Sequence, residues 1–365
     1  MLESIHLLQS LTSRAHVTLV GRAATAIYAI LRVLDVRDQW VLIPANTCYI
    51  VLWAVLRSGS RPYLVDVDPA TGNITRDTLA VFQAGKPAVV IPCHMYGLGA
   101  PMTEICAWAQ ANGAFVIEDA TLAIGSTVEG RPAGAWGDAS VFSFGQGKIV
   151  DVQLGGAMLT DDARLAREVQ RALADAPVWD DRHIGLTNQW NALYWAMHQY
   201  EDANPRLLEL YPKLFDLYGE LTAYRLPESY WHDLPDALRH LPANLAHRAE
   251  MARLYDELPV RTLARPEGST LWRYPLLAEH RNDLLQHLWE QGVHDATRWY
   301  PALRHMASAL APGISQQPTP GADRLGAAII NLRVDEGVSR EDIEKTAAII
   351  REYFEPPRRE GRQEK

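Results

Sequence analysis

The sequence has few cysteines and no arrangement of them that a structural site would need. Only three occur among 365 residues, and no C-x-x-C pair or cysteine–histidine cluster is present. A disulfide-stapled fold or a structural zinc module is therefore not indicated, and no metal site is expected. So few thiols suit a reducing compartment, and residues 1–4 (MLES) lack the basic start of a signal peptide. We therefore expect a cytoplasmic protein.

Long apolar runs and an excess of positive charge are also missing. The most apolar stretch, residues 41–56, is interrupted by Pro44, Asn46 and Thr47, and it is too short and polar to span a bilayer. The formal net charge of -9 disfavours nucleic-acid binding through overall charge. No G-x-G-x-x-G follows the first predicted strand, so a nicotinamide-dinucleotide enzyme is not indicated. We expect neither a nucleic-acid nor a membrane partner.

What is present in the first 160 residues is an alternation of segments typical of strands and helices. Such alternation predicts an α/β fold with a mainly parallel sheet, helices on its faces, and ligands near the carboxyl ends of the strands. The predicted strands are 40–43, 62–66, 86–92, 114–118, 124–128, 139–144 and 156–160, and the predicted helices are 24–34, 48–56 and 102–112.

The composition changes after residue 160. Residues 161–253 look mainly helical and hold many aromatic residues, which is typical of helix packing and of a subunit interface. The pattern that follows predicts strands at 271–277 and 328–334 and helices at 282–290 and 340–353. We therefore predict a large domain over 1–253, which includes the helical segment, and a small α+β domain over 254–355. The polar tail, 356–365, is expected to be disordered.

Lys148 is the most informative residue, because it follows an apolar strand that ends in small residues and a hydroxyl (139–148, ASVFSFGQGK). Asp119 ends another predicted strand, 116–119 (VIED). Taken alone, Lys148 would be interpreted as a surface lysine and Asp119 as a cap of the next element. Together at the ends of strands in one sheet, they are the two groups that pyridoxal phosphate (PLP) chemistry needs. The amine forms a Schiff base with the aldehyde, and the carboxylate keeps the ring nitrogen protonated.

Three further features suit the phosphate of such a cofactor. Residues 21–26 (GRAATA) open a predicted helix with small side chains, so its free N–H groups and its dipole can face an anion. Ser143 lies five residues before the lysine and can donate its hydroxyl to the same group. Gly155 and Gly156 permit a close approach of the backbone. Each feature is weak alone, and the combination carries the argument.

Five ordered motifs resemble the DegT-type nucleotide-sugar aminotransferases, a family of PLP-dependent enzymes of fold type I. They are 61–69 (RPYLVDVDP), 91–97 (IPCHMYG), 116–120 (VIEDA), 137–139 with 142–144 (GDA, FSF), and Lys148 with its two following glycines; 273–275, 299–301 and 330–332 add to them. The resemblance covers most of 18–160 and returns from 272 to 353. It implies a large domain with a mainly parallel sheet, a small C-terminal domain, and a homodimer whose active site lies at the subunit interface.

The resemblance also implies roles for individual residues. Lys148 would be the Schiff-base lysine and would carry protons during the reaction, and Asp119 would be the partner of the pyridine nitrogen. The residues implied to bind the phosphate are Ser143 and, through their backbone, Ala23, Ala24 and Thr25.

Several positions depart from the family pattern. The usual position of the aromatic that stacks on the ring holds Cys48, so Tyr49 is the candidate for that role. The Asn-Tyr-Arg stretch that reaches the neighbouring subunit's cofactor is not clear, and Asn188 is its nearest candidate. Leu122 and Ile124 occupy positions that are often glutamine and histidine. They lower the polarity around the cofactor and remove partners for a hydroxyl-rich substrate.

The leading hypothesis is an aminotransferase in sugar, cell-surface or specialised-metabolite biosynthesis. It would move an amino group from an amino acid, expected to be glutamate, to a keto sugar or similar keto acceptor, which includes nucleotide-linked sugars. One alternative is a PLP enzyme of the same fold with altered, non-sugar chemistry. Another is a catalytically inactive homologue that acts as a binding or regulatory protein, against which the retained Lys148 and Asp119 argue.

Overall fold

The computed structural model describes residues 1–200, 205–310, 314 and 317–355, so the tail predicted to be disordered lies outside the described residues. The strands are β1 (His16–Val20), β2 (Trp40–Pro44), β3 (Arg61–Val65), β4 (Pro87–Val90), β5 (Phe115–Asp119), β6 (Thr127–Val128), β7 (Arg131–Pro132), β8 (Ala139–Ser143), β9 (Gly156–Thr160), β10 (Arg261–Thr262), β11 (Tyr274–Leu277) and β12 (Ile329–Leu332). The α-helices are α1 (Leu2–Thr12), α2 (Ala23–Val33), α3 (Tyr49–Ser58), α4 (Arg76–Ala80), α5 (Met102–Asn112), α6 (Ala163–Ala174), α7 (Asp181–Tyr200), α8 (Tyr211–Leu217), α9 (Leu234–Asp256), α10 (Arg281–Glu290), α11 (Arg304–Leu310), α12 (Pro320–Ala328) and α13 (Arg340–Phe354). Short 3₁₀ turns occupy Met95–Gly97, Pro205–Leu210, Tyr218–Leu221 and Glu228–Trp231.

A seven-stranded sheet in the order β1-β9-β8-β5-β4-β2-β3 forms the centre of the molecule. Strands β8, β5, β4, β2 and β3 are parallel to their neighbours within that group, and β9 runs antiparallel to both β8 and β1. The predicted mainly parallel sheet is therefore confirmed. Its strands are almost continuously buried, as expected where helices cover both faces.

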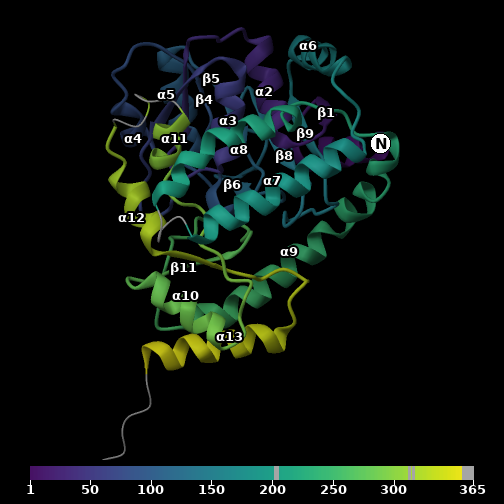
Figure 1. Ribbon diagram of the computed structural model, residues 1–365. Coiled ribbons are helices and arrows are strands. Elements are labelled where there is room, and N and C mark those ends of the chain that lie inside the picture. Colours follow the sequence, from purple (N-terminus) through teal and green to yellow (C-terminus); the bar gives the residue numbers. More distant parts are fainter. Residues whose placement is uncertain (201–204, 311–313, 315–316, 356–365) are drawn as a thin grey trace, which may run out of the picture.

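The C-terminal elements gather around a second, antiparallel sheet of order β10-β11-β12 (Figure 1). Helices α10 and α13 pack beside it, and the long helix α9 contacts both α1 and α13. Asp66, after β3, accepts hydrogen bonds from the backbone N–H groups of Gly321 and Ala322, each at 2.9 Å, and so caps α12 from the main sheet. The domain boundary near residue 253 stays a prediction.

The strand predicted at 124–128 is wrong for its first three residues. Strand β6 holds only Thr127 and Val128, and it pairs with β7 outside the main sheet. The N–H groups of Ala123 and Ser126 donate to carbonyls three residues back, and Gly125 has a φ of 83°, so the chain turns here. The apolar residues of this segment are buried as a loop. The apolar residues at 124–126 therefore reflect burial in a loop and not the formation of a strand. The strand predicted at 271–277 is likewise shorter, because β11 begins at Tyr274.

The aromatic residues of the helical segment pack inside the chain itself. Trp190 and Tyr194 on α7 are buried, with stacked rings whose centroids lie 5.2 Å apart. Trp195, by contrast, is 44% exposed. The predicted role in helix packing is confirmed, and a role in a subunit interface stays a prediction.

Candidate active site

Lys148 and Asp119, which are 29 residues apart in sequence, line one pocket. The pocket lies where the parallel strands end: Asp119 is the last residue of β5, Lys148 follows β8, and Cys48 follows β2 as the cap of α3. It is narrow, with a volume of about 20 Å³. Its full lining is Thr47, Cys48, Cys93, His94, Met95, Asp119, Thr121, Leu122, Lys148 and Tyr300.

The protein environment of Lys148 favours the neutral form of its side-chain amine more strongly than water would. Burial lowers the pKa of this amine below its ordinary value of 10.5, and the nearby Cys48 and Asp119 only partly oppose the shift. A neutral amine is the form that attacks a carbonyl carbon. The position therefore suits a nucleophilic lysine better than a surface one.

We expect the buried amine to cost stability in the absence of a ligand. The folded state binds a proton at Lys148 less readily than the unfolded chain, so stability should rise with pH in the alkaline range until about 10.5. Lys148→Met should remove this rise and unfold at a higher temperature than wild type at pH 7. Thermal unfolding of the two ligand-free proteins from pH 7 to 10 measures the effect. Equal slopes for both proteins would contradict it.

Asp119 is held in a fixed orientation. Its Oδ1 accepts a hydrogen bond from the backbone N–H of Thr121 at 3.0 Å, and its Oδ2 accepts one from the thiol of Cys93 at 3.5 Å. The backbone of Asp119 is paired with Pro92 and His94 on the neighbouring segment after β4. The carboxylate is buried and yet keeps lone pairs for a donor in the pocket.

Behind the aspartate lies a fully buried pair, His94 and Glu118. Nδ1 of His94 accepts the backbone N–H of Ala100 at 3.0 Å, so Nε2 carries the proton and donates to Glu118 at 2.9 Å. Glu118 also accepts backbone N–H groups from Gly134, at 2.6 Å, and Trp136, at 2.8 Å. The adjacent Asp119 is thereby anchored through its neighbour on the same strand.

Replacing Glu118 by glutamine is expected to destabilise the fold by roughly 1–3 kcal/mol, because an amide cannot accept all of these donors. Burial acts to raise the pKa of Glu118, but the hydrogen bonds from His94, Gly134 and Trp136 outweigh it and lower the pKa below its ordinary value. The stabilisation is therefore present at neutral pH and is lost as pH falls through the folded-state pKa.

Urea unfolding of wild type and Glu118→Gln at pH 7 and pH 4 measures both effects. The exposed Glu129, which accepts hydrogen bonds from Thr103, provides the matched control Glu129→Gln, for which a much smaller change is expected. A free energy of unfolding for Glu118→Gln equal to that of the control would contradict the role of Glu118.

The segments predicted to bind a phosphate also meet. Ser143, at the end of β8, pairs with Gly156 at the start of β9. A Cβ on Gly156 would lie 2.6 Å from the backbone nitrogen of Ala23, so β9 abuts the first turn of α2. The N–H groups of Ala23 and Ala24 have no partner within the helix, whereas that of Thr25 donates to the carbonyl of Arg22 at 3.0 Å. Glycine at 156 thus permits the close approach of β9 to this helix end, and the free N–H groups beside the Ser143 hydroxyl fit a phosphorylated cofactor.

The remaining predicted residues lie in different places. The backbone of Ala24 lies in the first turn of α2, whereas the hydroxyl of Thr25 donates to the carbonyl of Thr222 at 2.9 Å. Tyr49 does not line the pocket; its ring packs against Trp53 and Tyr194, with centroids 5.0 and 4.8 Å away.

Asn188 is exposed on α7 and does not line the pocket of Lys148 either. The aromatic side chain in the pocket is instead Tyr300, which the sequence argument did not assign to the site.

Sequence reasoning also missed Tyr224. Its hydroxyl donates to the carbonyl of Gly21 at 3.1 Å and accepts from Nε of Arg22 at 2.7 Å, beside the start of α2. Tyr224 and Arg225 repeat the last two residues of the family's Asn-Tyr-Arg stretch, with Ala223 in the first position. That tripeptide was the signal that could have located this segment.

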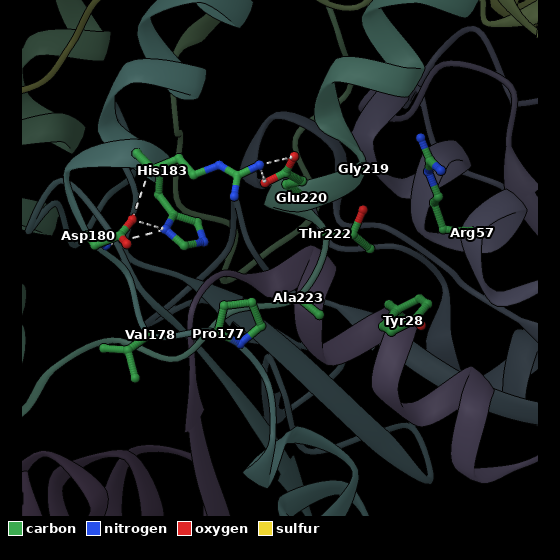
Figure 2. Close-up of a pocket in the computed structure, with 11 residues that line it drawn as sticks. Tyr28, Arg57, Pro177, Val178, Asp180, His183, Gly219, Glu220, Thr222 and Ala223 are labelled. Atoms are coloured by element: carbon green, nitrogen blue, oxygen red, sulfur yellow. Dashed lines mark hydrogen bonds and ion pairs between the residues drawn. The ribbon is translucent and has the colours of Figure 1, made fainter.

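A larger cavity of about 650 Å³ lies elsewhere, between α2, the start of α7 and the turn at 219–223. Figure 2 shows Asp180 beside His183 in its wall. Arg182, which also lines the cavity, forms an ion pair with Glu220 at 2.8 Å. Its charged groups are thus largely paired with one another. None of the residues predicted for the site lines it. Size alone therefore does not mark the reactive site here.

Comparison with known proteins identifies the family. The model of the DegT/DnrJ/EryC1/StrS aminotransferase family matches residues 6–186, about half of the chain, including Lys148 and Asp119. The chain belongs to this family. The predicted assignment to the aminotransferases of fold type I is thereby confirmed.

Relatives of this aminotransferase-family chain extend over nearly its whole length. The erythromycin biosynthesis sensory transduction protein EryC1 of Saccharopolyspora erythraea is 28% identical over 92% of this chain and 85% of that protein. UDP-N-acetyl-3-dehydro-alpha-D-glucosamine 3-aminotransferase of Acidithiobacillus ferrooxidans is 27% identical over 93% and 85%. A crystal structure of a DegT DnrJ EryC1 StrS aminotransferase from Brucella abortus has a TM-score of 0.78 at 23% identity and covers 96% of this chain and 89% of its own. That structural likeness supports the fold.

Proposed function

We propose that this chain is a PLP-dependent aminotransferase that moves an amino group from an amino acid, glutamate in the first instance, to a keto sugar or similar keto acceptor. The observation that carries the proposal is the meeting of Lys148 and Asp119 in one pocket at the carboxyl ends of the parallel strands. Several relatives, among them the Acidithiobacillus ferrooxidans enzyme, are named for the amination of nucleotide-linked sugars.

Each residue has a defined task in this proposal. PLP, when bound, supplies an aldehyde and a ring that accepts electrons. Lys148 supplies the amine that attaches it and afterwards moves a proton at Nζ. Asp119 keeps the proton on the ring nitrogen. Ser143 and the backbone of residues 23–25 would hold the phosphate at the start of α2.

One feature of the pocket favours a second candidate, a PLP enzyme with altered, non-sugar chemistry. Leu122 lines the pocket at a position where many family members have glutamine. Ile124, two residues later in the sequence, is also buried. An apolar wall offers no hydrogen bonds to a hydroxyl-rich acceptor. Two relatives are named as a sensory transduction protein and a pleiotropic regulatory protein. A regulatory role without catalysis is less favoured for this chain, because Lys148 and Asp119 are both retained.

We propose a homodimer in the cytoplasm as the working form, with the exposed Asn188 as the candidate contact to the neighbouring subunit's cofactor. Among the residues described, no helix combines the length and apolarity needed to span a bilayer. A monomeric mass by light scattering at working concentration would contradict the dimer.

The proposed function is tested by the visible absorption spectrum of the full-length protein. We expect added PLP to produce a visible band and glutamate to bleach it, as the amino group passes to the cofactor. A band that glutamate leaves unchanged would favour another donor or the altered-chemistry candidate, which a panel of amino acids and keto acceptors then separates. No band at any PLP concentration would reject the enzyme proposal.

A further inference from the structure

Arg22 is held in an unusual way at the start of α2. It caps the helix in an extended conformation, and its Nε and Nη1 donate to the hydroxyls of Tyr224, at 2.7 Å, and Tyr218, at 3.0 Å. The guanidinium also lies over both rings, 5.3 and 5.5 Å from their centroids. Two neutral phenols therefore fix the position of the guanidinium without cancelling its charge.

The charge of Arg22 has no acidic partner within the described part of the chain. No carboxylate of the described residues makes an ion pair or hydrogen bond with it, and its side-chain hydrogen bonds go to the two neutral tyrosines. The side chain is only partly exposed. A partly buried cation without a counter-charge is costly unless a ligand supplies the anion.

Arg22 also lies beside the groups that would hold a phosphate. It pairs with Gly155 in a bridge between the start of α2 and the start of β9. A Cβ on Gly156 would lie 2.7 Å from the carbonyl carbon of Arg22. Burial raises the pKa of the Cys48 thiol, which lines the pocket of Lys148, and the charge of Arg22 weakly opposes that rise.

We propose that Arg22, oriented by Tyr218 and Tyr224, supplies the positive charge that binds the phosphate group of the cofactor. The helix end and Ser143 offer only neutral donors, whereas a phosphate dianion gains most from a charged, hydrogen-bonding partner. This inference rests on the proposed function, because it assumes that PLP occupies the pocket. It assigns Arg22 as a charged residue that binds the phosphate, a role that the family resemblance did not imply.

A purely structural role for Arg22 makes a different prediction. Arg22 joins α2 to the 218–224 segment, so its loss could simply loosen that contact. Loosening would weaken every ligand of the pocket alike. Loss of a phosphate ligand would weaken only ligands that carry a phosphate. Pyridoxal, which has the same aldehyde and ring but no phosphate, separates the two explanations.

The test measures the affinity of full-length Arg22→Met for PLP and for pyridoxal, by titrating the visible band. We expect the dissociation constant for PLP to rise about 10- to 100-fold and that for pyridoxal to change less than twofold. Arg22→Lys, which keeps the charge but not the two-armed contact with the tyrosines, should lie in between. Thermal unfolding of each ligand-free variant reports whether it is folded. If Arg22→Met is unfolded, the comparison of PLP with pyridoxal is made with Arg22→Lys.

Arg182→Met is the matched control. This arginine is exposed on α7 and contacts the same 218–224 segment through Glu220 at 2.8 Å, but it does not line the pocket of Lys148, so both dissociation constants should stay at wild-type values. Equal weakening of PLP and pyridoxal in Arg22→Met, or no weakening of PLP, would overturn the inference. Wild-type protein that forms no band with PLP would instead reject the proposed function, so the two failures are distinguishable.

Discussion

Replacing Lys148 by alanine is expected to abolish the visible band that PLP forms with the wild-type protein, and to lower the rate of amino transfer by roughly 10³-fold or more. The variant loses the only amine that lines the pocket among the described residues. It therefore loses both the group that attaches the aldehyde and the group that moves the proton. The spectrum and the rate with glutamate measure the two losses separately.

The matched control for this prediction is Lys86→Ala. Lys86 is exposed just before β4 and does not line the pocket, so its removal should leave both readouts at wild-type values. Binding of PLP should survive in part in Lys148→Ala, because the start of α2 and Ser143 remain. A wild-type band and rate in Lys148→Ala would show that another group carries the chemistry.

Replacing Asp119 by asparagine is expected to give a different pattern, in which the band forms but amino transfer slows by roughly 10²- to 10⁴-fold. Asparagine keeps the shape of the side chain, and its single oxygen can still accept the N–H of Thr121, whereas its NH2 group takes the place of the oxygen that accepts the thiol of Cys93. It lacks the negative charge that would hold the ring nitrogen protonated. Stopped-flow measurement of band bleaching by glutamate gives the rate.

Asp138→Asn is the control for the loss of a carboxylate from the same pair of strands. Asp138 directly precedes β8, at the opposite end of that strand from the pocket, and accepts the N–H of Val116 at 2.8 Å. Its replacement should reduce stability while leaving the rate per folded molecule unchanged. If Asp119→Asn bleached at the wild-type rate, the carboxylate would have no part in the reaction.

The approach of Lys148 and Asp119 followed from the sequence because it depends on a general property of parallel sheets. Apolar runs identified β5 and β8, and neighbouring parallel strands end at the same edge, so the groups that follow them must be close. Separate features of the sequence predicted that Ser143, the glycines after Lys148 and the small residues that open α2 serve one phosphate. The prediction of strands from apolar runs failed at 124–126 and at 271–273, where buried residues do not form a strand.

Other parts of the site depended on contacts that no local pattern encodes. Tyr49 is the first residue of α3, and its ring packs against Trp53 and against Tyr194 on α7 without lining the pocket. The aromatic side chain that lines the pocket is Tyr300, from the C-terminal part of the chain. The geometry at Arg22 requires Tyr218 and Tyr224, about 200 residues away in sequence. Periodicity tells which side chains are buried, but it does not tell which distant element they meet.

The sequence by itself therefore determined the family, the mainly parallel sheet and the two groups at its strand ends, because these follow from strand order and short motifs. The tertiary structure alone decided which aromatic side chain enters the pocket and how Glu118 anchors the strand of Asp119. It also decided which residues surround the charge of Arg22. Those arrangements arise where several elements pack together, so they are properties of the folded chain and not of any one segment.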